Sequence, residues 1–357
     1  MDECPTAWIR AIGTAVPSND IHQTFVDWAE ARIADRRERA LFRRMAARSG
    51  IDHRWSVLPQ NSDGGSPVEP GGFYHGNTLP TTAQRMVRYA EDAPTLAIAA
   101  IMALAAQTAI DGVTHLVVAS CTGFVAPGID QIIIRRLGLS PATERTLVGF
   151  MGCYAAVAAL RLAYHIVRSQ PAAQVLVVTV ELSSLHLTGM RDIESLLAAL
   201  QFGDGAAAAL VSAQPARLSL DRFFCATLPD SAELIQWTIG DEGFNMALSG
   251  EVPGRITQAL RQPAMRDTLQ HGRMGGDVAW AVHAGGRSIL DAVAHGLDLP
   301  DHALDESRAV LRDNGNMSSA TLMFVLARMV NDSARRQGVA LAFGPGLAAE
   351  GFDFTLS

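Results

Sequence analysis

An internal repeat constrains the fold of this chain more than any other feature of its sequence. Two short apolar runs, Leu116–Ala119 and Ala279–Val282, have the length of buried strands, and each leads to a polar residue. A second polar residue then stands at a turn before an apolar helical stretch, 32 residues on in the first copy (153 − 121) and 33 in the second (316 − 283). The four polar residues are Cys121, Cys153, His283 and Asn316. The sequence thus predicts a duplicated α/β fold whose halves, residues 1–212 and 213–357, face each other across one pocket.

Strand and helix signals alternate from Thr114 onward, which favours α/β layers with parallel strand pairing. The predicted buried strands are His115–Ala119, Val175–Val180 and Val278–Val282, and the predicted buried helices are Ala155–Val167 and Ser318–Val330. Earlier in the chain, an Arg-rich helical stretch runs from about Asp27 to Arg48. It is either a solvated helix face or a site for an anionic ligand.

Composition excludes several classes of function. The net charge is -7, which argues against a nucleic-acid partner. All 29 basic residues are Arg, so a Schiff-base, pyridoxal-phosphate or P-loop mechanism has no lysine to use. The uncharged run Ala93–Ile110 contains Pro, Thr and Gln, and we expect a buried helix there rather than a membrane span.

The four cysteines are widely spaced and include no C-x-x-C pair for zinc or redox chemistry. The N-terminus is acidic and polar and does not read as a signal peptide. We therefore expect reduced thiols, no metal site, no membrane partner and a cytoplasmic location.

Cys153 is the candidate nucleophile. It follows Gly152 and opens an Ala-rich helical stretch, and a helix N-terminus lowers the pKa of a thiol. A buried structural cysteine is the alternative reading. His283 ends a strand at Gly285-Gly286, where its imidazole can project past the sheet, and an imidazolium there would stabilise the thiolate. These features predict a Cys153 that is partly ionised at neutral pH.

Asn316 lies in an Asn-Gly-Asn-Met-Ser-Ser turn before an apolar helix. Its simplest role is an N-cap, worth about 1 kcal/mol, but Ser318 or Ser319 could cap the helix equally well. The Asn316 amide is then available, with His283, to form an oxyanion hole for a thioester carbonyl.

Five motifs follow one another along the chain: Gly-Cys-Tyr-Ala-Ala at Cys153, Phe-Gly-Asp-Gly-Ala-Ala-Ala at Phe202, His-Ala-Gly-Gly at His283, Gly-Asn-Met-Ser-Ser-Ala at Gly315 and Gly-Pro-Gly-Leu at Gly344. In this order they resemble the motifs of the chalcone and stilbene synthase family, the type III polyketide synthases of the thiolase superfamily. The resemblance covers nearly the whole chain. Ala284 departs from it, since the family motif has Pro there.

The resemblance implies a five-layered αβαβα thiolase fold, a homodimer, and no cofactor beyond coenzyme A thioesters as substrates. Cys153 would accept an acyl group from an acyl-CoA starter. His283 and Asn316 would hold malonyl-CoA while its decarboxylation yields the attacking enolate. Repeated condensation would give a pyrone-type or a resorcinol- or phenol-type polyketide. A carrier protein is compatible with the resemblance but is not implied by it.

The resemblance also assigns residues to the cavity and to coenzyme A. Phe202 and Met246 fall on two gating positions, the second of which is Phe in plant members. The remaining cavity positions fall on Cys121, His186 and Ser318, and His186 is expected to hydrogen-bond the growing chain. Arg44 and Arg48 match basic positions that grip the CoA phosphates.

Three other functions use the same features. A ketoacyl-synthase-III-like enzyme would perform a single condensation, on CoA- or carrier-protein-bound chains, with the same Cys, His and Asn. A Cys hydrolase would release only free acid. A catalytically silent acyl-CoA-binding or scaffold protein would release no carbon dioxide from malonyl-CoA.

Overall fold

The structure is a computed structural model that describes residues 5–59, 66–75, 79–187, 192–270, 278–330 and 336–357. Its strands are β1 (Ala7–Ala15), β2 (Asn19–Asp20), β3 (Trp55–Ser56), β4 (His115–Ser120), β5 (Glu144–Gly149), β6 (Gln174–Leu182), β7 (Asp204–Ser212), β8 (Leu218–Thr227), β9 (Ile235–Gly240), β10 (Gly243–Leu248), β11 (Ala279–Val282), β12 (Arg336–Gly344) and β13 (Ala348–Leu356). The three predicted strands are confirmed as β4, β6 and β11.

The helices are α1 (His22–Arg32), α2 (Arg36–Ala46), α3 (Thr82–Ala105), α4 (Ile129–Leu137), α5 (Ala155–Ser169), α6 (Ile193–Ala199), α7 (Val252–Leu260), α8 (Pro263–Gln270), α9 (Arg287–Leu297), α10 (Asp305–Asn314) and α11 (Ala320–Val330). Four 3-10 turns join them: η1 (Gly152–Tyr154), η2 (Ser183–His186), η3 (Asp301–Leu304) and η4 (Pro345–Leu347). The two predicted buried helices are confirmed as α5 and α11.

The strand order confirms the duplication that the sequence repeat predicts. One ladder of nine strands runs β11-β12-β13-β8-β1-β7-β6-β4-β5. From β1 outward, the order β1-β7-β6-β4 pairs antiparallel, antiparallel and then parallel. From β8 outward, β8-β13-β12-β11 repeats that pattern, and β1 pairs with β8 where the two sets meet.

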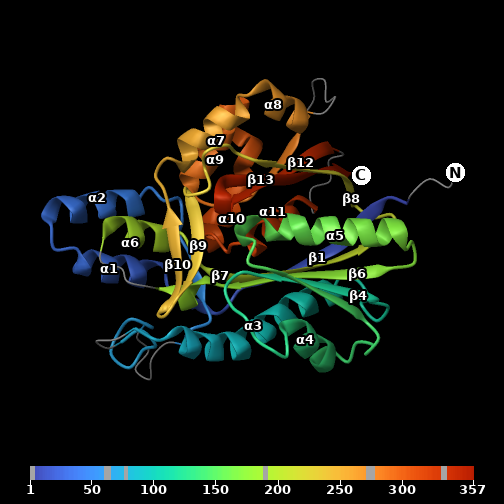
Figure 1. Ribbon diagram of the computed structural model, residues 1–357, viewed down its shortest axis with the longest axis horizontal. Helices are drawn as coiled ribbons and strands as arrows, with labels where there is room; N and C mark the ends of the chain where they lie inside the picture. The colour runs from blue at the N-terminus through green and yellow to red at the C-terminus, as the bar shows by residue number, and fades with distance from the viewer. Residues whose placement is uncertain (1–4, 60–65, 76–78, 188–191, 271–277, 331–335) are drawn as a thin grey trace.

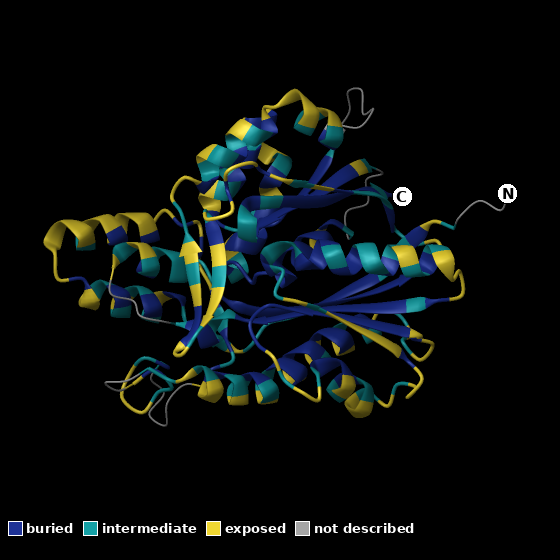
Figure 2. Cartoon of the chain, viewed as in Figure 1, coloured by how far each residue is buried: buried dark blue, intermediate teal, exposed yellow. Residues whose placement is uncertain are grey.

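The helices lie in three layers around the two strand sets (Figure 1). Helices α5 and α11 lie between the sets, α3 and α4 cover one outer face, and α7 and α9 cover the other. Side chains of β6 alternate between the layers: Val175 and Val177 join the central core, and Leu176 and Val178 join the core under α3. Because both of their faces are covered, β4, β6 and β7 are buried almost throughout and are rich in apolar residues, and Figure 2 shows these inner strands in dark blue.

Two helical expectations need correction. The Arg-rich stretch is two helices, since α1 ends at Arg32 and α2 begins after Asp35, whose carboxylate accepts hydrogen bonds from Arg37 and Glu38 N–H. The run from Ala93 is the second part of α3, which begins at Thr82 and passes through Pro94. Among the described residues, no helix is long and apolar enough to cross a membrane.

Candidate active site

Cys153 sits in the tight turn η1 that leads into α5. Gly152 has a positive φ of 72°, and a Cβ at this position would lie 2.4 Å from Cδ of Pro345. Only glycine fits such a position, so the Gly before the nucleophile and the Gly-Pro-Gly-Leu turn are parts of one contact. This contact fixes where the thiol stands.

Asn316 and Ser318 both lie near enough to Cys153 to lower the pKa of its thiol against the larger effect of burial, and Ser318 Oγ lies 3.9 Å from Sγ. Asn316 Nδ2 donates to Gly285 O at 3.1 Å and its Oδ1 accepts from Ser318 N at 2.8 Å. The amide is thus held at both ends, and Nδ2 keeps a second N–H that can donate to a substrate oxygen.

His283 follows β11 and is buried with 2% exposure. Its backbone is fixed, because its N–H donates to Leu341 O at 2.8 Å and its carbonyl accepts from Gly285 N at 2.9 Å. Neither ring nitrogen has a hydrogen-bond partner among the described residues. Gly285, which accepts from Asn316, ties the His283 turn to the amide. The pairing of the imidazole with the thiol itself stays a prediction.

Burial changes the expected protonation of the pair. It raises the pKa of Cys153 to about 12, against smaller opposing effects of Ser318 and Asn316, and it lowers the pKa of His283 to about 3. The pKa shifts run against the expectation of a partly ionised thiol. The helix end favours the thiolate, but the partial loss of solvent around Cys153 favours the neutral thiol, and the burial of His283 favours the neutral imidazole.

Cys121 lies beneath the same turn. It is 2% exposed, and its Sγ accepts from Gly152 N at 2.8 Å. Its own N–H and the Thr122 hydroxyl bond to Glu181, which also accepts from Ser319 Oγ. Burial raises the pKa of Glu181 to about 7. The sequence analysis missed this carboxyl, although it is a lone acidic residue at the end of an apolar strand.

A cavity of about 230 Å³ opens beside Phe202 and Met246. Its other walls come from α1, α6, β3, η2 and the β9–β10 hairpin. His186, on η2, is one of the lining residues. Most lining side chains are apolar, among them Ile21, Phe25, Leu58, Val68 and Leu187. Cys121 and Ser318 are not among the lining residues, so the structure places them at the nucleophile turn rather than on this wall.

His186 is already fully engaged. Its Nε2 donates to Thr122 O at 2.6 Å, and its Nδ1 accepts from Phe244 N at 3.0 Å. The ring stacks on Phe244 at 4.2 Å and meets Trp237 edge-on at 5.5 Å. Burial lowers the pKa of His186 to about 3. The expected hydrogen bond from His186 to a growing chain therefore needs correction, since both nitrogens serve the protein.

Trp237 is a wall residue that the sequence analysis missed. It lines the cavity, and its Nε1 donates to Cys121 O at 2.8 Å. Nothing in its local sequence marks it, because its neighbours Cys121 and His186 are remote in the chain.

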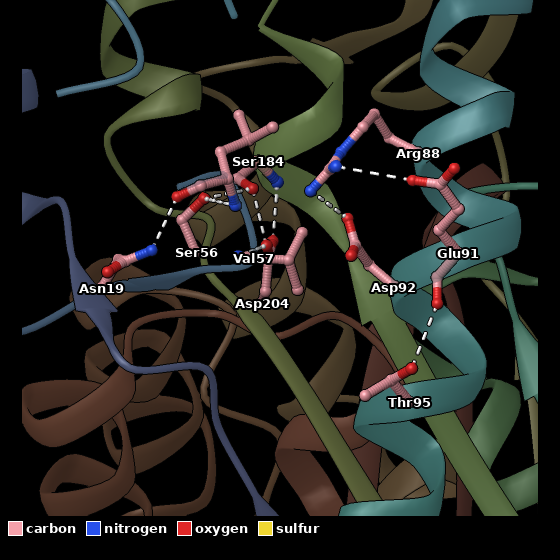
Figure 3. Close-up of polar contacts among 10 residues, drawn as sticks. Asn19, Ser56, Val57, Arg88, Glu91, Asp92, Thr95, Ser184 and Asp204 are labelled. Atoms are coloured by element: carbon pink, nitrogen blue, oxygen red, sulfur yellow. Dashed lines mark hydrogen bonds and ion pairs between the residues drawn. The ribbon is translucent and has the colours of Figure 1, made fainter. Parts of the chain in front are cut away.

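Asp204 joins two walls of the cavity (Figure 3). Its carboxylate accepts from Val57 N at 2.9 Å and from the N–H and hydroxyl of Ser184 at 2.7 and 2.6 Å. Ser56 Oγ bonds to the same hydroxyl at 2.7 Å. Burial raises the pKa of Asp204 to about 6. The Gly-Asp-Gly motif thus places a carboxylate where it holds β3 against η2.

Arg44 and Arg48 lie at the exposed end of α2, which Figure 2 shows in yellow. Arg48 O accepts from Arg287 Nη1 at 3.2 Å, and Arg287 opens α9 directly after the His283 turn. The basic end of α2 and the candidate oxyanion site therefore belong to neighbouring segments.

Solved structures of known proteins share this fold. The PKS-I of the brown alga Ectocarpus siliculosus superposes with a TM-score of 0.90 and 27% identity over 100% of both chains. The C-terminal type III polyketide synthase domain of Steely1 from Dictyostelium superposes with a TM-score of 0.89 and 25% identity over 98% of this chain and 99% of that one. The chain thus has the thiolase fold, the fold of enzymes that form carbon–carbon bonds by acyl transfer.

The family follows from sequence. Models of the N-terminal and C-terminal domains of chalcone and stilbene synthases match residues 3–215 and 220–355. The chain belongs to this family, the type III polyketide synthases.

Two curated relatives differ in the share of their length that this chain matches. The "alpha-pyrone synthesis polyketide synthase-like Pks18" of Mycobacterium tuberculosis is 36% identical over 253 residues, which cover 68% of this chain and 64% of that protein. Bisdemethoxycurcumin synthase of Oryza sativa subsp. japonica is 32% identical over 376 residues, covering 96% of this chain and 91% of that protein.

Alkylation of Cys153 by iodoacetamide should accelerate steadily from about pH 6 to about pH 9, because its raised pKa keeps the reactive thiolate scarce throughout. Mass spectrometry of the Cys153 peptide measures the rate, and the exposed Cys225 peptide in the same digest controls for reagent. A rate that levels off below about pH 7 would instead reveal a stable thiolate–imidazolium pair.

Proposed function

We propose that this chain extends an acyl-CoA starter by repeated decarboxylative condensation with malonyl-CoA, through an acyl-Cys153 intermediate. The products are pyrone-type or resorcinol- or phenol-type polyketides. The observation that supports the proposal is the Asn316 amide, which is fixed by Gly285 O and Ser318 N near Cys153 and keeps a second N–H for a substrate oxygen.

Loading begins from a neutral thiol. The unprotonated nitrogen of His283 accepts the Cys153 proton as Sγ attacks the thioester carbonyl, and coenzyme A leaves with a proton. The lowered pKa of His283 supports this order, since a neutral imidazole can accept a proton and an imidazolium cannot. The acyl group is then bound to Sγ.

Condensation follows at the same donors. The carboxylate of malonyl-CoA leaves as carbon dioxide, and its bonding electrons form an enolate whose oxygen receives hydrogen bonds from Asn316 Nδ2 and the His283 N–H. The enolate carbon attacks the acyl carbonyl on Cys153, and Sγ leaves. Return of the lengthened chain to Cys153 starts the next cycle.

Asn316→Ala should still load an acyl group on Cys153 but should lose about 100-fold in malonyl-CoA decarboxylation, as expected for one oxyanion donor. Peptide mapping after incubation with labelled acyl-CoA measures loading, and carbon dioxide release measures decarboxylation. Asn314→Ala is the matched control, because the one hydrogen bond that the Asn314 side chain makes within the described residues goes to Val310 O in its own helix. Label on Cys121, or carbon dioxide release within about threefold of the parent, would refute these roles.

The apolar cavity supports an aliphatic acyl starter. Met246 lines it on the exposed β9–β10 hairpin and can adapt its shape to a chain. His186 and Trp237 bound the same space as a rigid aromatic wall, so we propose that they limit extension by shape.

Met246→Phe should shift the starter preference towards shorter acyl chains, because a larger side chain in a packed wall costs about 1–3 kcal/mol. Product masses from a panel of acyl-CoA starters measure the preference. Met102→Phe, an equal change at an exposed site on α3, is the control. Unchanged starter preference and product masses in Met246→Phe would show that this wall does not bound the working cavity.

Arg44 and Arg48 are proposed to grip the CoA phosphates through charge-assisted hydrogen bonds. Arg44→Ala and Arg48→Ala should each raise KM for acyl-CoA by about tenfold, with little change for acyl N-acetylcysteamine thioesters, which lack the phosphates. Arg135→Ala on α4 is the control, an exposed arginine on another face. Equal losses on both substrates would contradict phosphate binding.

We also propose a homodimer in a reducing, cytoplasmic compartment. Phe124 and Leu147 are 48% and 54% exposed and line one hollow beside β5, the end strand of the ladder. An apolar hollow at a strand edge needs a cover, and a second copy would supply it. A monomeric mass by sedimentation would contradict the dimer.

A further inference from the structure

A buried arginine, Arg54, lies between the cavity gate and the candidate oxyanion loop. It is 1% exposed, and burial lowers its pKa to about 9, so it stays charged at neutral pH. No carboxylate bonds to its guanidinium among the described residues. Its guanidinium bonds are to a neutral ring and to carbonyls: Nε donates to His22 Nδ1 at 3.1 Å and Nη1 donates to Ala199 O and Phe202 O.

Such a charge is costly to bury. Apolar residues in place of buried ions often leave a protein as stable or more so, so burial alone gives no reason for an arginine here. The geometry of its hydrogen bonds does give a reason for an arginine at this position. The two Nη1 bonds, 2.8 and 2.9 Å long, fix the end of α6 and the backbone of Phe202 together.

The other side of the Phe202 segment pairs with Asn316. Gly203 N donates to Asn316 O at 3.0 Å, and Asn316 N donates to Gln201 O at 2.8 Å. The segment 199–203 is therefore held from one side by Arg54 and from the other by the backbone of the residue whose amide faces Cys153. A shift of Phe202 must move Asn316.

The stem of Arg54 completes this contact. A Cβ at Gly315 would lie 2.8 Å from Cγ of Arg54, and a Cβ at Gly203 would lie 3.5 Å from its Cβ. Gly315 has a positive φ of 68°, which favours glycine. The side chain thus packs on both glycines that flank the Phe202–Asn316 pairing.

The neighbours of Arg54 in the chain bind the helix that leads to Asn316. The N–H groups of Asp52 and His53 donate to Arg312 O, and Trp55 Nε1 donates to Asp313 O at 3.0 Å. Residues 52–55 therefore contact the end of α10, the Asn316 turn and the gate at once.

We infer that Arg54 is a positioning residue that sets Asn316 and Phe202 in register, so that the gate and the enolate-stabilising amide keep one geometry. The inference rests on the proposed function, since it gives Asn316 its role there. Arg54 also lines the cavity, but its two Nη1 bonds go to the backbone of Ala199 and Phe202, through which it acts on Asn316. A displacement of about 1 Å at such a donor can cost about 100-fold in rate.

The test compares carbon dioxide release from malonyl-CoA in the parent, Arg54→Met and Arg54→Lys, with melting temperatures measured alongside. We expect kcat to fall about tenfold or more in Arg54→Met with KM within about threefold, because the amide is displaced but CoA binding is not. The kcat of Arg54→Lys should lie between those of the parent and Arg54→Met. A lysine ammonium can reach either carbonyl but lacks the planar, fixed donor geometry of a guanidinium.

Arg85 supplies a matched control. It is also buried, with 0% exposure, and it also donates to backbone carbonyls, those of Pro80, Leu185 and Leu187. None of its bonds reaches residues 199–203 or the Asn316 turn. Arg85→Met should therefore lose comparable thermal stability while kcat for decarboxylation stays within about threefold.

Each outcome decides the inference. A parental kcat in Arg54→Met, or an equal kcat loss in Arg85→Met, overturns it in favour of general stability. If Arg54→Met does not fold at the assay temperature, Arg54→Lys decides: a kcat lowered more than about threefold supports the inference, and a parental kcat overturns it. A parent enzyme that releases no carbon dioxide would instead refute the proposed function itself.

Discussion

The burial of α5 and α11 between the two strand sets fixes the positions of Cys153 and Asn316. All the side chains of α11 from Ala320 to Leu326 are buried, and α5 buries its apolar face in the same core. Burial of each Leu or Val side chain contributes about 1.5–3 kcal/mol to the free energy of folding, so neither helix can slide without a large loss of stability. Because Cys153 and Asn316 stand just before these helices, hydrophobic packing sets the position of the candidate nucleophile and of the candidate oxyanion donor.

The same packing decides protonation. The partly buried Cys153 thiol has less water around it to stabilise its anion than an exposed thiol has. The positive end of α5 makes up for only part of this lost solvation energy. The neutral imidazole follows from the same loss of solvent. In the loading step that we propose, a proton then passes between two neutral groups, the Cys153 thiol and the His283 imidazole, rather than within a stored ion pair.

The sequence predicted the parts of this structure that repeat. Runs such as Val175–Val180 are buried on both faces and read directly as strands, and the matched spacing of Cys121–Cys153 and His283–Asn316 located the two pairs of element ends. The break between α1 and α2 was missed because Ile33–Asp35 is short and the arginines continue across it.

The ionisation of Cys153 and the engagement of His186 were wrong for a common reason. Each depends on how many atoms from distant segments surround the side chain, and a local pattern carries no record of that. Thr122 and Phe244, which occupy the two nitrogens of His186, lie 64 and 58 residues away in the chain.

Most of the cavity wall lies outside the repeated strands. The residues that would select a substrate are therefore largely separate from the residues that we propose react with it. Segments that bound the cavity, β3, η2 and the β9–β10 hairpin, are additions to the duplicated strands, joined by long-range bonds such as those of Asp204. A substitution on this wall outside the Phe202 segment can change the space for a chain without moving Cys153 or Asn316. Arg54 is where the two systems meet, since the backbone it holds belongs to the gate on one side and pairs with Asn316 on the other. The shape of the cavity and the position of Asn316, the proposed enolate donor, are therefore coupled through one guanidinium.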